Sequence, residues 1–404
     1  MAGLSRVGTS LSAAVITLLP DKCFIGGIWT GRMVSPSLPT LGTVDTMRTH
    51  STADSRCPDV MSARLHSEWS ALAGQVGTVF SSRPSFGLNA PCNSNGTLRF
   101  VEVRRGGDLV AFAPLCVTSL GPVKIARPLG VGQGVPTELL AVDDDASVEL
   151  WDAIAGLDAL VFADSMVDDR NLRSLRRHPA FSARVVSRER VPLIQVPEGV
   201  SPRDLRSTKT LKRLRQYRNQ LSRSGTPMCI EVIEDVEHLD QRWNDISTLA
   251  AAATERSRYV NFLRNGMAME FLRAEAAAGR LIIAGLTVGG RWMAHDIGIR
   301  TGDRIEAWLT HHDRRVRRFE PGHQMIEWFV EAHDDLGVTV LDQGLGVNEI
   351  KKSWTNADYG VHAIAASPKS GLLAKVMIDT LMAWELSPAV AHARRIRRTR
   401  PALR

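Results

Sequence analysis

The sequence has few cysteines, few aromatic residues and no long apolar run. Its five Cys are scattered over 404 residues, with no C-x-x-C pair and no Cys/His cluster of the kind that binds zinc. Their odd number and scatter argue against a disulfide framework and favour reduced thiols. No apolar run approaches the roughly 18 residues of a membrane-spanning helix. We therefore expect a cytoplasmic protein, and leave open a peripheral location at the inner membrane face.

Two segments account for the net positive charge of the chain. The formal net charge is +7, but residues 201–225 hold eight Lys or Arg against one Asp, and residues 394–404 hold six Arg. The rest of the chain carries a net charge of −6. Any contact with an anionic membrane surface or with tRNA therefore has to be made through these two segments. We expect no specific nucleic-acid partner, because aromatic residues for base stacking are nearly absent from residues 201–225.

The bulk of the chain is predicted to fold. Hydrophobic residues make up 44% and charged residues 23%, both near the averages of globular proteins. Residues 1–60 are rich in Ser, Thr, Gly and Pro and show no sustained period. We interpret them as a disordered leader or as sequence upstream of the true start.

From Met228 onward the periodicity predicts a definite order of elements. A strand at 228–235 is followed by helices at about 237–252 and 267–278 and by three strands at 281–288, 292–300 and 304–310. Gly289-Gly290 and residues 301–303 are typical of tight hairpin turns, so the three strands should form an antiparallel meander. A basic loop, a helix opening at Gly322 and a buried strand at 338–343 complete the order.

The basic loop and the helix after it predict an anion site. The loop reads HHDRRVRRFEPGH, and the first turn of a helix presents free N–H groups and the positive end of its dipole. Four arginines of the loop add positive charge. A diphosphate is the kind of group that such a site holds, although a solvated surface loop would carry the same pattern.

Three stretches of the second half resemble the GNAT-type acyltransferases, and within them the CelD/BcsL group linked to cellulose and other exopolysaccharide biosynthesis. They are TLKRLRQYRNQLSRSG, THHDRRVRRFEPGHQMIEWF and LDQGLGVNEIKKSW. The chain departs from the family pattern at Glu320, Gln343 and Ile350, where Ser, an aromatic residue and Tyr are usual. The residues that match the pattern are Thr310, Asp313, Pro321, Gly322, Asp342, Gly344, Gly346, Lys351 and Trp354.

The first half repeats the pattern of the second. Gly106-Gly107 aligns with Gly289-Gly290 between two strand-like runs, but the first half lacks a basic Pro-Gly loop. The resemblance implies an α/β fold of two tandem GNAT-like domains with mixed sheets, as in the related FemAB peptidyltransferases. We expect a first domain at 61–200, a basic linker helix at 201–226, a second domain with the acyl-CoA site at 227–366, and a C-terminal helix with an Arg-rich tail at 367–404.

The basic linker has three interpretations. It is a helix docked on an acidic surface, an electrostatic site for an anionic partner, or a helix that contacts nucleic acid or a membrane surface. Its apolar stripe at Leu211, Leu214 and Leu221 has helical spacing.

The resemblance implies transfer of an acyl group, most simply acetyl, from acyl-CoA to an amine or hydroxyl of a small-molecule or saccharide acceptor. We weighed His295, Asp296, Glu306, His311, His312 and Asp342 as the base. We predict Asp342, His295 and Lys351 as catalytic residues. For the cofactor we predict Arg317, Arg318, Gly322, His323 and Gln324, and we expect no metal. The alternatives are a FemAB-like transferase that uses aminoacyl-tRNA and a non-catalytic accessory protein of polysaccharide synthesis.

Overall fold

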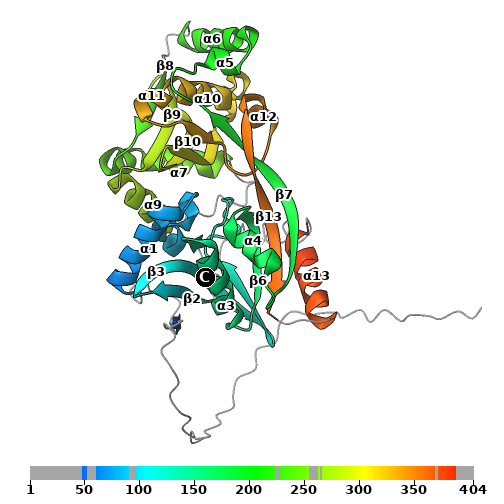
Figure 1. The fold of residues 1–404 in the computed structure, drawn as a ribbon. Helices are drawn as coiled ribbons and strands as arrows, with labels where there is room; N and C mark the ends of the chain where they lie inside the picture. The colour runs from blue at the N-terminus through cyan, green and yellow to red at the C-terminus, as the bar shows by residue number, and fades with distance from the viewer. Residues whose placement is uncertain are drawn as a thin grey trace, which may run out of the picture. The chain divides into compact units, whose positions relative to one another are not determined.

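The computed structural model describes residues 48–51, 61–90, 96–223, 227–253, 263, 266–368 and 372–387. In these ranges the chain forms a mixed β-sheet covered by helices (Figure 1). The strands lie in the order β1-β2-β3-β4-β6-β13-β7-β12-β11-β10-β9-β8, and β5 pairs with β3. The pairs β4–β6 and β11–β12 are parallel, whereas the other pairs are antiparallel. The predicted mixed α/β fold is confirmed.

The second half follows the predicted order closely. Gly289 and Gly290 have φ of 60° and 73°, so the turn between its first two meander strands uses the left-handed conformation that glycine adopts without strain. The buried strand is shorter than predicted, and the basic loop contains a 3₁₀ helix. The elements are β8 (Met228–Ile233), α7 (Val236–Ala253), α9 (Gly266–Ala277), β9 (Leu281–Val288), β10 (Arg291–Thr301), β11 (Arg304–His312), η3 (Arg314–Phe319), α10 (Pro321–Glu331), α11 (His333–Leu336), β12 (Val340–Asp342), α12 (Glu349–Trp354) and β13 (Ala357–Ser367).

The first half has the same succession of elements. A strand precedes helical segments, a three-strand meander, a helix, a strand, a short helix and a last strand. The elements are β1 (Arg48–Ser51), α1 (Ala63–Val76), η2 (Phe80–Ser82), α2 (Pro84–Asn89), β2 (Gly96–Arg105), β3 (Asp108–Leu120), β4 (Val123–Pro128), β5 (Leu140–Ala141), α3 (Asp144–Ala155), β6 (Leu160–Val167), α4 (Arg170–Arg177) and β7 (Ser182–Gln195).

The two halves exchange their last strands. β7 pairs with β12, β13 pairs with β6, and β7 and β13 pair with each other from Ala357–Leu193 to Ser367–Ser182 (Figure 1). Backbone N–H and C=O groups in a sheet need these partners, so each half completes its sheet with a strand of the other. β13, the last strand of the predicted second domain at 227–366, lies between β6 and β7 of the first half. The following helix α13 (Leu372–Leu386) packs against β13.

The basic linker forms two helices, α5 (Pro202–Leu205) and α6 (Thr208–Arg223). Leu211 and Leu214 are buried in one cluster with apolar residues of α10. The Arg218 guanidinium lies 2.6 Å from a carboxylate oxygen of Glu327 on α10. These contacts agree with the interpretation of a helix docked on an acidic surface.

Three further predictions concern the N-terminal segment, the cysteines and the C-terminal segment. Residues 48–51 of the predicted leader form β1, which pairs with β2, while the rest of residues 1–60 lies outside the described residues. Cys116 is disulfide-bonded, contrary to the expected reduced thiols. The C-terminal helix is present as α13, and the Arg-rich tail lies outside the described residues. No described helix combines the length and apolar character needed to cross a bilayer.

Aromatic and polar contacts join the first half to the second. The Phe80 ring lies 5.9 Å from that of Phe271, and the Phe86 ring lies 5.8 Å from that of Trp308, measured between centroids. The Phe80 N–H donates to a carboxyl oxygen of Glu306 at 2.8 Å. Burial raises the pKa of Glu306 to about 8, with a further contribution from the nearby Asp342. Residues of the first half thus contact the side chains of Glu306 and Trp308 on β11.

Glu138 is a second buried carboxyl near this contact. It lies in the loop before β5 and accepts hydrogen bonds from the Thr78 N–H at 2.8 Å and from the Thr78 hydroxyl at 3.1 Å. Burial and the nearby Asp169 raise its pKa to about 8. This carboxyl therefore keeps its proton at neutral pH in the folded chain.

Replacing Glu138 with Gln should weaken the pH dependence of stability. In the unfolded chain this carboxyl loses its proton at a pKa of about 4.5, and in the folded chain at about 8. The free energy of unfolding should therefore fall as the pH rises from about 4.5 to about 8. Gln has no proton to lose, and the two pKa values differ by about 3.5 at about 1.4 kcal/mol for each unit. Near pH 8 we therefore expect Glu138→Gln to be more stable than the natural chain by up to about 4 kcal/mol.

Urea unfolding across this pH range measures the effect. Glu68→Gln serves as the control, because Arg104 lowers the pKa of Glu68 to about 2. That variant should lose stability above about pH 4 rather than gain it. Equal pH profiles for the natural chain and Glu138→Gln would contradict the assignment.

Candidate functional site

β11 and β12 lie side by side for only three residues and then separate, forming a fork. Arg304–Glu306 pair with Val340–Asp342 in parallel register, after which β11 continues to His312. Trp308 is an extra residue in the register between β10 and β11, because Gly298 pairs with Ala307 and Ile297 with Leu309. A β-bulge of this kind bends its strand, and bulges are frequent next to active sites.

A glycine turn closes the fork on the β12 side. Gly344 has φ of +67°, and a Cβ atom at this position would lie 2.3 Å from the Ala307 carbonyl oxygen. An Asp342 carboxylate oxygen accepts from the Gly344 N–H at 2.8 Å. The Lys351 ammonium donates to the carbonyl oxygens of Gly344 at 3.2 Å and Leu345 at 2.8 Å. The structure thus brings together two predicted catalytic residues, Asp342 and Lys351, on one turn.

These hydrogen bonds give Asp342 and Lys351 a role in shaping the fork. Asp342 is 2% exposed, and Arg304 lies 3.5 Å from its second carboxylate oxygen. Burial raises the pKa of Asp342 and lowers that of Lys351, so burial opposes the charge of both groups. Glu306 is the register partner of Asp342. Two carboxyl groups this close repel each other when both are ionised, so at least one of them tends to keep its proton.

The prediction of His295 as a base is not supported. The ring is fully buried, its Nδ1 accepts from the Trp292 indole N–H at 3.1 Å, and its Nε2 lies 2.9 Å from His311 Nδ1. An indole only donates, so neutral His295 carries its proton on Nε2 and donates it to His311. Burial lowers the pKa of His295 well below its usual value, and that of His311 to about 4. Both ring nitrogens of His295 are therefore occupied within the core.

Asp296 is the better candidate for a base, although we did not choose it from the sequence. It lies on the face of β10 opposite to His295, because neighbouring residues of a strand point to opposite sides. Its register partner Thr310 is on the part of β11 beyond the fork and donates a hydroxyl hydrogen bond to it at 2.9 Å. Burial raises the pKa of Asp296 to about 6, while Thr310 and the charge of Lys351 act in the opposite direction.

The chain passes from β11 through the short 3₁₀ helix η3 into the first turn of α10, which begins at Pro321. Glu320 precedes it with a left-handed φ of 53°, and its carboxylate is paired with Arg213 of α6 at 3.0 Å. Among the described residues, no acceptor lies within hydrogen-bond distance of the N–H groups of Gly322 and His323. A Cβ at Gly322 would lie 3.6 Å from Ile350 of α12, an ordinary contact. The turn therefore offers backbone donors beside α12.

The predicted cofactor residues fall into two groups. Arg317 and Arg318 are exposed on η3, and the Arg318 guanidinium lies 4.6 Å from the centroid of the Phe319 ring. The side chains of His323 and Gln324 instead hold α10 in place. His323 Nδ1 accepts from the Trp354 indole at 2.8 Å, and the Gln324 amide donates to the Leu214 carbonyl at 3.1 Å. Any contact that these two residues make with a ligand has to come from their backbone.

The corresponding fork of the first half is closed by its own chain. β4 and β6 pair in parallel only through Ile125–Leu160 and Ala126–Val161. Beyond these pairs, Thr137 forms a parallel bridge with Met166 of β6. A residue of the loop that follows β4 thus pairs with β6 beyond the end of β4. This difference agrees with the expectation that a nucleotide cofactor would bind the second half.

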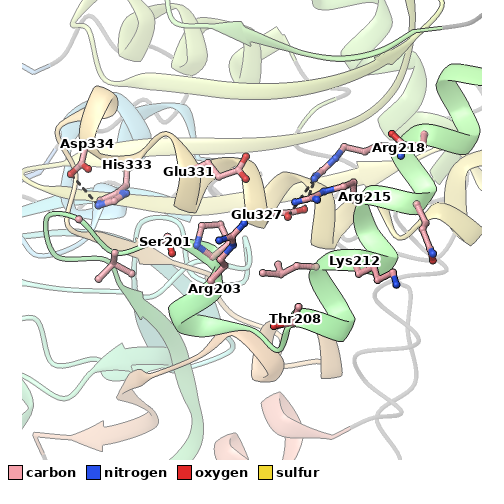
Figure 2. Close-up of a pocket in the computed structure, with 16 residues that line it drawn as sticks. Ser201, Arg203, Thr208, Lys212, Arg215, Arg218, Glu327, Glu331, His333 and Asp334 are labelled. Carbon is pink, nitrogen blue, oxygen red and sulfur yellow. Dashed lines mark hydrogen bonds and ion pairs between the residues drawn. The ribbon is translucent and has the colours of Figure 1, made fainter.

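A separate groove of about 1010 Å³ lies between α5–α6 and α10–α11 (Figure 2). It is lined by Arg203 and Arg215, which form no ion pair with a described residue, and by Glu331 opposite them. Its α10 residues come from the second and third turns, so it is distinct from the first-turn amides. The described residues contain no group of three or more His, Cys, Asp or Glu side chains arranged to hold a metal ion.

Comparison with known proteins shows what the second half of the chain is similar to. Residues 208–352 match the family model described as an acetyltransferase (GNAT) domain. This confirms the predicted GNAT domain, while the CelD/BcsL assignment stays a prediction. A search of curated proteins found no significant match.

Several solved structures are similar to the chain. L-PGS from Bacillus licheniformis has 11% identity and a TM-score of 0.47 over 78% of this chain and 94% of that one. FemX has 13% identity and a TM-score of 0.42 over 74% and 95%. A tandem GNAT protein from the clavulanic acid biosynthesis pathway has 12% identity and a TM-score of 0.44 over 81% and 100%.

The close approach at the fork predicts that Gly344 tolerates no side chain. Gly344→Ala should lower the free energy of unfolding by about 2 to 4 kcal/mol, because its Cβ would meet the Ala307 carbonyl and its φ is strained. Gly346→Ala is the matched control. Its φ is +83° but nothing lies within 4 Å of its Cβ, so only about 1 kcal/mol should be lost. Denaturant unfolding of both variants tests this, and equal losses would contradict the clash.

Proposed function

We propose that the chain transfers an acyl group from acyl-CoA to an amine or hydroxyl acceptor, and that its second half holds the acyl-CoA. The observation that carries the proposal is the contrast between the two forks. In the first half, Thr137 bridges to β6 beyond the fork. In the second half, β11 continues beyond the fork and the chain then reaches the first turn of α10. A thioester cofactor needs this combination of a slot for its arm and a donor site for its diphosphate.

The diphosphate would lie at the first turn of α10. The N–H groups of Gly322 and His323 and the positive end of the helix dipole suit an anion, with Arg317 and Arg318 as counter-charges. Glu320 does not oppose this, because Arg213 neutralises its carboxylate at 3.0 Å. The departure from the family's usual Ser is thereby compensated within the chain.

The acyl arm would lie along β11 beyond Glu306. Acyl transfer requires a donor for the developing oxyanion and a base for the acceptor. The bulge at Trp308 lies in the stretch Arg304–Thr310, where the resemblance implies a backbone donor. Asp296, with a pKa of about 6, is mostly ionised at neutral pH and can accept the proton of the attacking amine or hydroxyl. The acceptor bonds to the thioester carbon and the C–S bond breaks. The departing CoA thiolate then takes the proton that Asp296 received, so CoA leaves as its thiol and Asp296 is ionised again.

An aminoacyl-tRNA donor is a second candidate, and the charge of α6 favours it. Lys209, Lys212 and Arg215 are exposed on α6 and form no ion pair with a described residue. Release of free CoA, measured beside transfer from charged tRNA, separates the two donors. A saccharide acceptor and a place in exopolysaccharide synthesis follow from the resemblance alone. Failure to bind any CoA thioester would favour a non-catalytic accessory role.

Binding of CoA should raise the melting temperature, because a ligand that binds only the native state stabilises it. Gly322→Asp should abolish this shift without unfolding the chain. A carboxylate in the first turn suits the helix dipole but repels a diphosphate. Gly322→Ala, whose Cβ makes only ordinary contacts, should keep the shift. Thermal denaturation with CoA, acetyl-CoA and longer acyl-CoAs tests this, and an unchanged shift in Gly322→Asp would contradict the placement.

Asp296→Asn should lower kcat/KM by about a hundredfold or more, because the variant has no base. In the natural chain kcat/KM should rise with pH through a midpoint near 6, where Asp296 loses its proton. Thr310→Val should move this midpoint upward, since the hydroxyl that lowers the pKa of Asp296 is lost. CoA release measured from about pH 5 to 9 tests both effects. An unmoved midpoint in Thr310→Val would argue against Asp296 as the base.

A further inference from the structure

α13 is apolar around most of its circumference, but the described chain covers only one side of it. Ala374, Ile378, Leu381 and Met382 are buried, and the last three pack with apolar residues of β4, β6 and β13. A helix that is hydrophobic on all sides is ordinarily buried on all sides or in contact with lipid. We therefore expect the outer side of α13 to contact a partner.

The outer side carries large apolar side chains at helical spacing. Leu372 is 79% exposed, Leu373 74%, Val376 51% and Trp384 59%. Thr380 and Ala383 lie between them and are also exposed. Contiguous exposed apolar surface of this kind marks an interaction site more often than a free surface.

The two acids of α13 are each paired with an arginine of the sheet, with the Glu385 side chain buried and that of Asp379 half-exposed at the edge of the outer side. Asp379 lies 2.5 Å from the Arg184 guanidinium, and Glu385 lies 2.8 Å from that of Arg127. No acidic side chain belongs to the outer apolar strip Leu372, Leu373, Val376, Thr380, Ala383 and Trp384. The outer strip thus carries nothing that an anionic surface would repel.

The sequence shortly after α13 supplies the complementary charge. Residues 394–404 contain six Arg and no acid. Stable binding of a peripheral protein to a membrane takes two signals, such as an apolar element and a polybasic segment. Each basic residue near an anionic lipid surface adds to the attraction. The apolar strip and the polybasic segment are separated by only a few residues along the chain.

We propose that the outer face of α13 and residues 394–404 together bind the surface of an anionic lipid bilayer. Leu372, Leu373, Val376 and Trp384 enter the interfacial region, where an amphipathic Trp is favoured, and the arginines meet the anionic headgroups. The helix lies on the membrane and does not cross it, in keeping with its length of 15 residues. This inference goes beyond the proposed acyl transfer and does not depend on it.

Charge favours a lipid surface over a second copy of the chain as the occupant. Two copies joined through α13 would hold two polybasic segments in one assembly with no added negative charge, and like charges repel. An anionic bilayer covers the apolar strip and neutralises the arginines at once. Dimerisation through α13 is therefore the competing outcome, which the oligomeric state reveals.

Sedimentation of the full chain with vesicles tests the proposal. We expect binding to phosphatidylcholine vesicles that contain phosphatidylglycerol, little binding to phosphatidylcholine alone, and weaker binding as salt is raised. The double variant Val376→Ser, Trp384→Ser should bind about tenfold more weakly. A variant with Gln in place of Arg at positions 394, 395, 397 and 398 should also lose at least tenfold.

The control is Val148→Ser, which replaces a 41% exposed apolar residue of α3 and should bind vesicles like the natural chain. Unchanged thermal unfolding and unchanged CoA release without lipid would show that the α13 variants remain folded. Absence of binding to anionic vesicles, or equal binding by the α13 double variant, overturns the proposal. So does a dimer in sedimentation equilibrium that Trp384→Ser converts to a monomer.

Discussion

The pairing of β7 with β13 is the constraint on which the rest of the structure depends. Each strand follows one half of the chain and completes the sheet of the other, so the ladder from Ala357 to Ser367 joins the halves. Because β7 also pairs with β12, and β13 with β6, this ladder fixes where each parallel pair ends. The two forks, β4–β6 and β11–β12, therefore lie at corresponding places on either side of it. Separating the halves would break three ladders and leave β6, β7, β12 and β13 with unsatisfied backbone groups.

The same architecture has been used differently in the two halves. In the first, the loop after β4 returns and Thr137 bridges to β6, so that fork is a packed part of the core. In the second, the chain after β11 forms η3 and α10, and the fork is held by the Gly344 turn. The first half meanwhile supplies Phe80 and Phe86 to the aromatic contacts around Trp308. The first half thus packs against the bulged part of β11, which is the part that our proposal assigns to the acyl arm.

Local sequence patterns predicted most of the elements but not how they are exchanged or what their polar residues do. Periodicity and turn glycines located β9, β10 and β11 to within two residues, because these signals are local. The pairing of β13 with β6 joins residues about 200 positions apart, and no local pattern encodes it. His295 looked like a base because its ring titrates near neutral pH, but its partners Trp292 and His311 remove that capacity. The properties of Asp296 depend on burial and on Lys351, 55 positions away, so only the fold reveals them.

The two basic segments illustrate why charge counted along a sequence is an incomplete guide to partners. In α6, Arg218 is bound to Glu327 and Arg213 to Glu320, so part of its charge is neutralised by the domain on which it docks. The stripe Leu211 and Leu214 is buried by the same contact. At α13 the relation is reversed, because the acids Asp379 and Glu385 are already paired and the apolar strip is exposed. The apolar strip that the described residues leave exposed and the arginines of residues 394–404 are the two features that our proposal assigns to an anionic surface, whereas α6 has largely found its partner inside the chain. Location at a membrane would thus depend on the C-terminal region, leaving the fork and α10 free for chemistry.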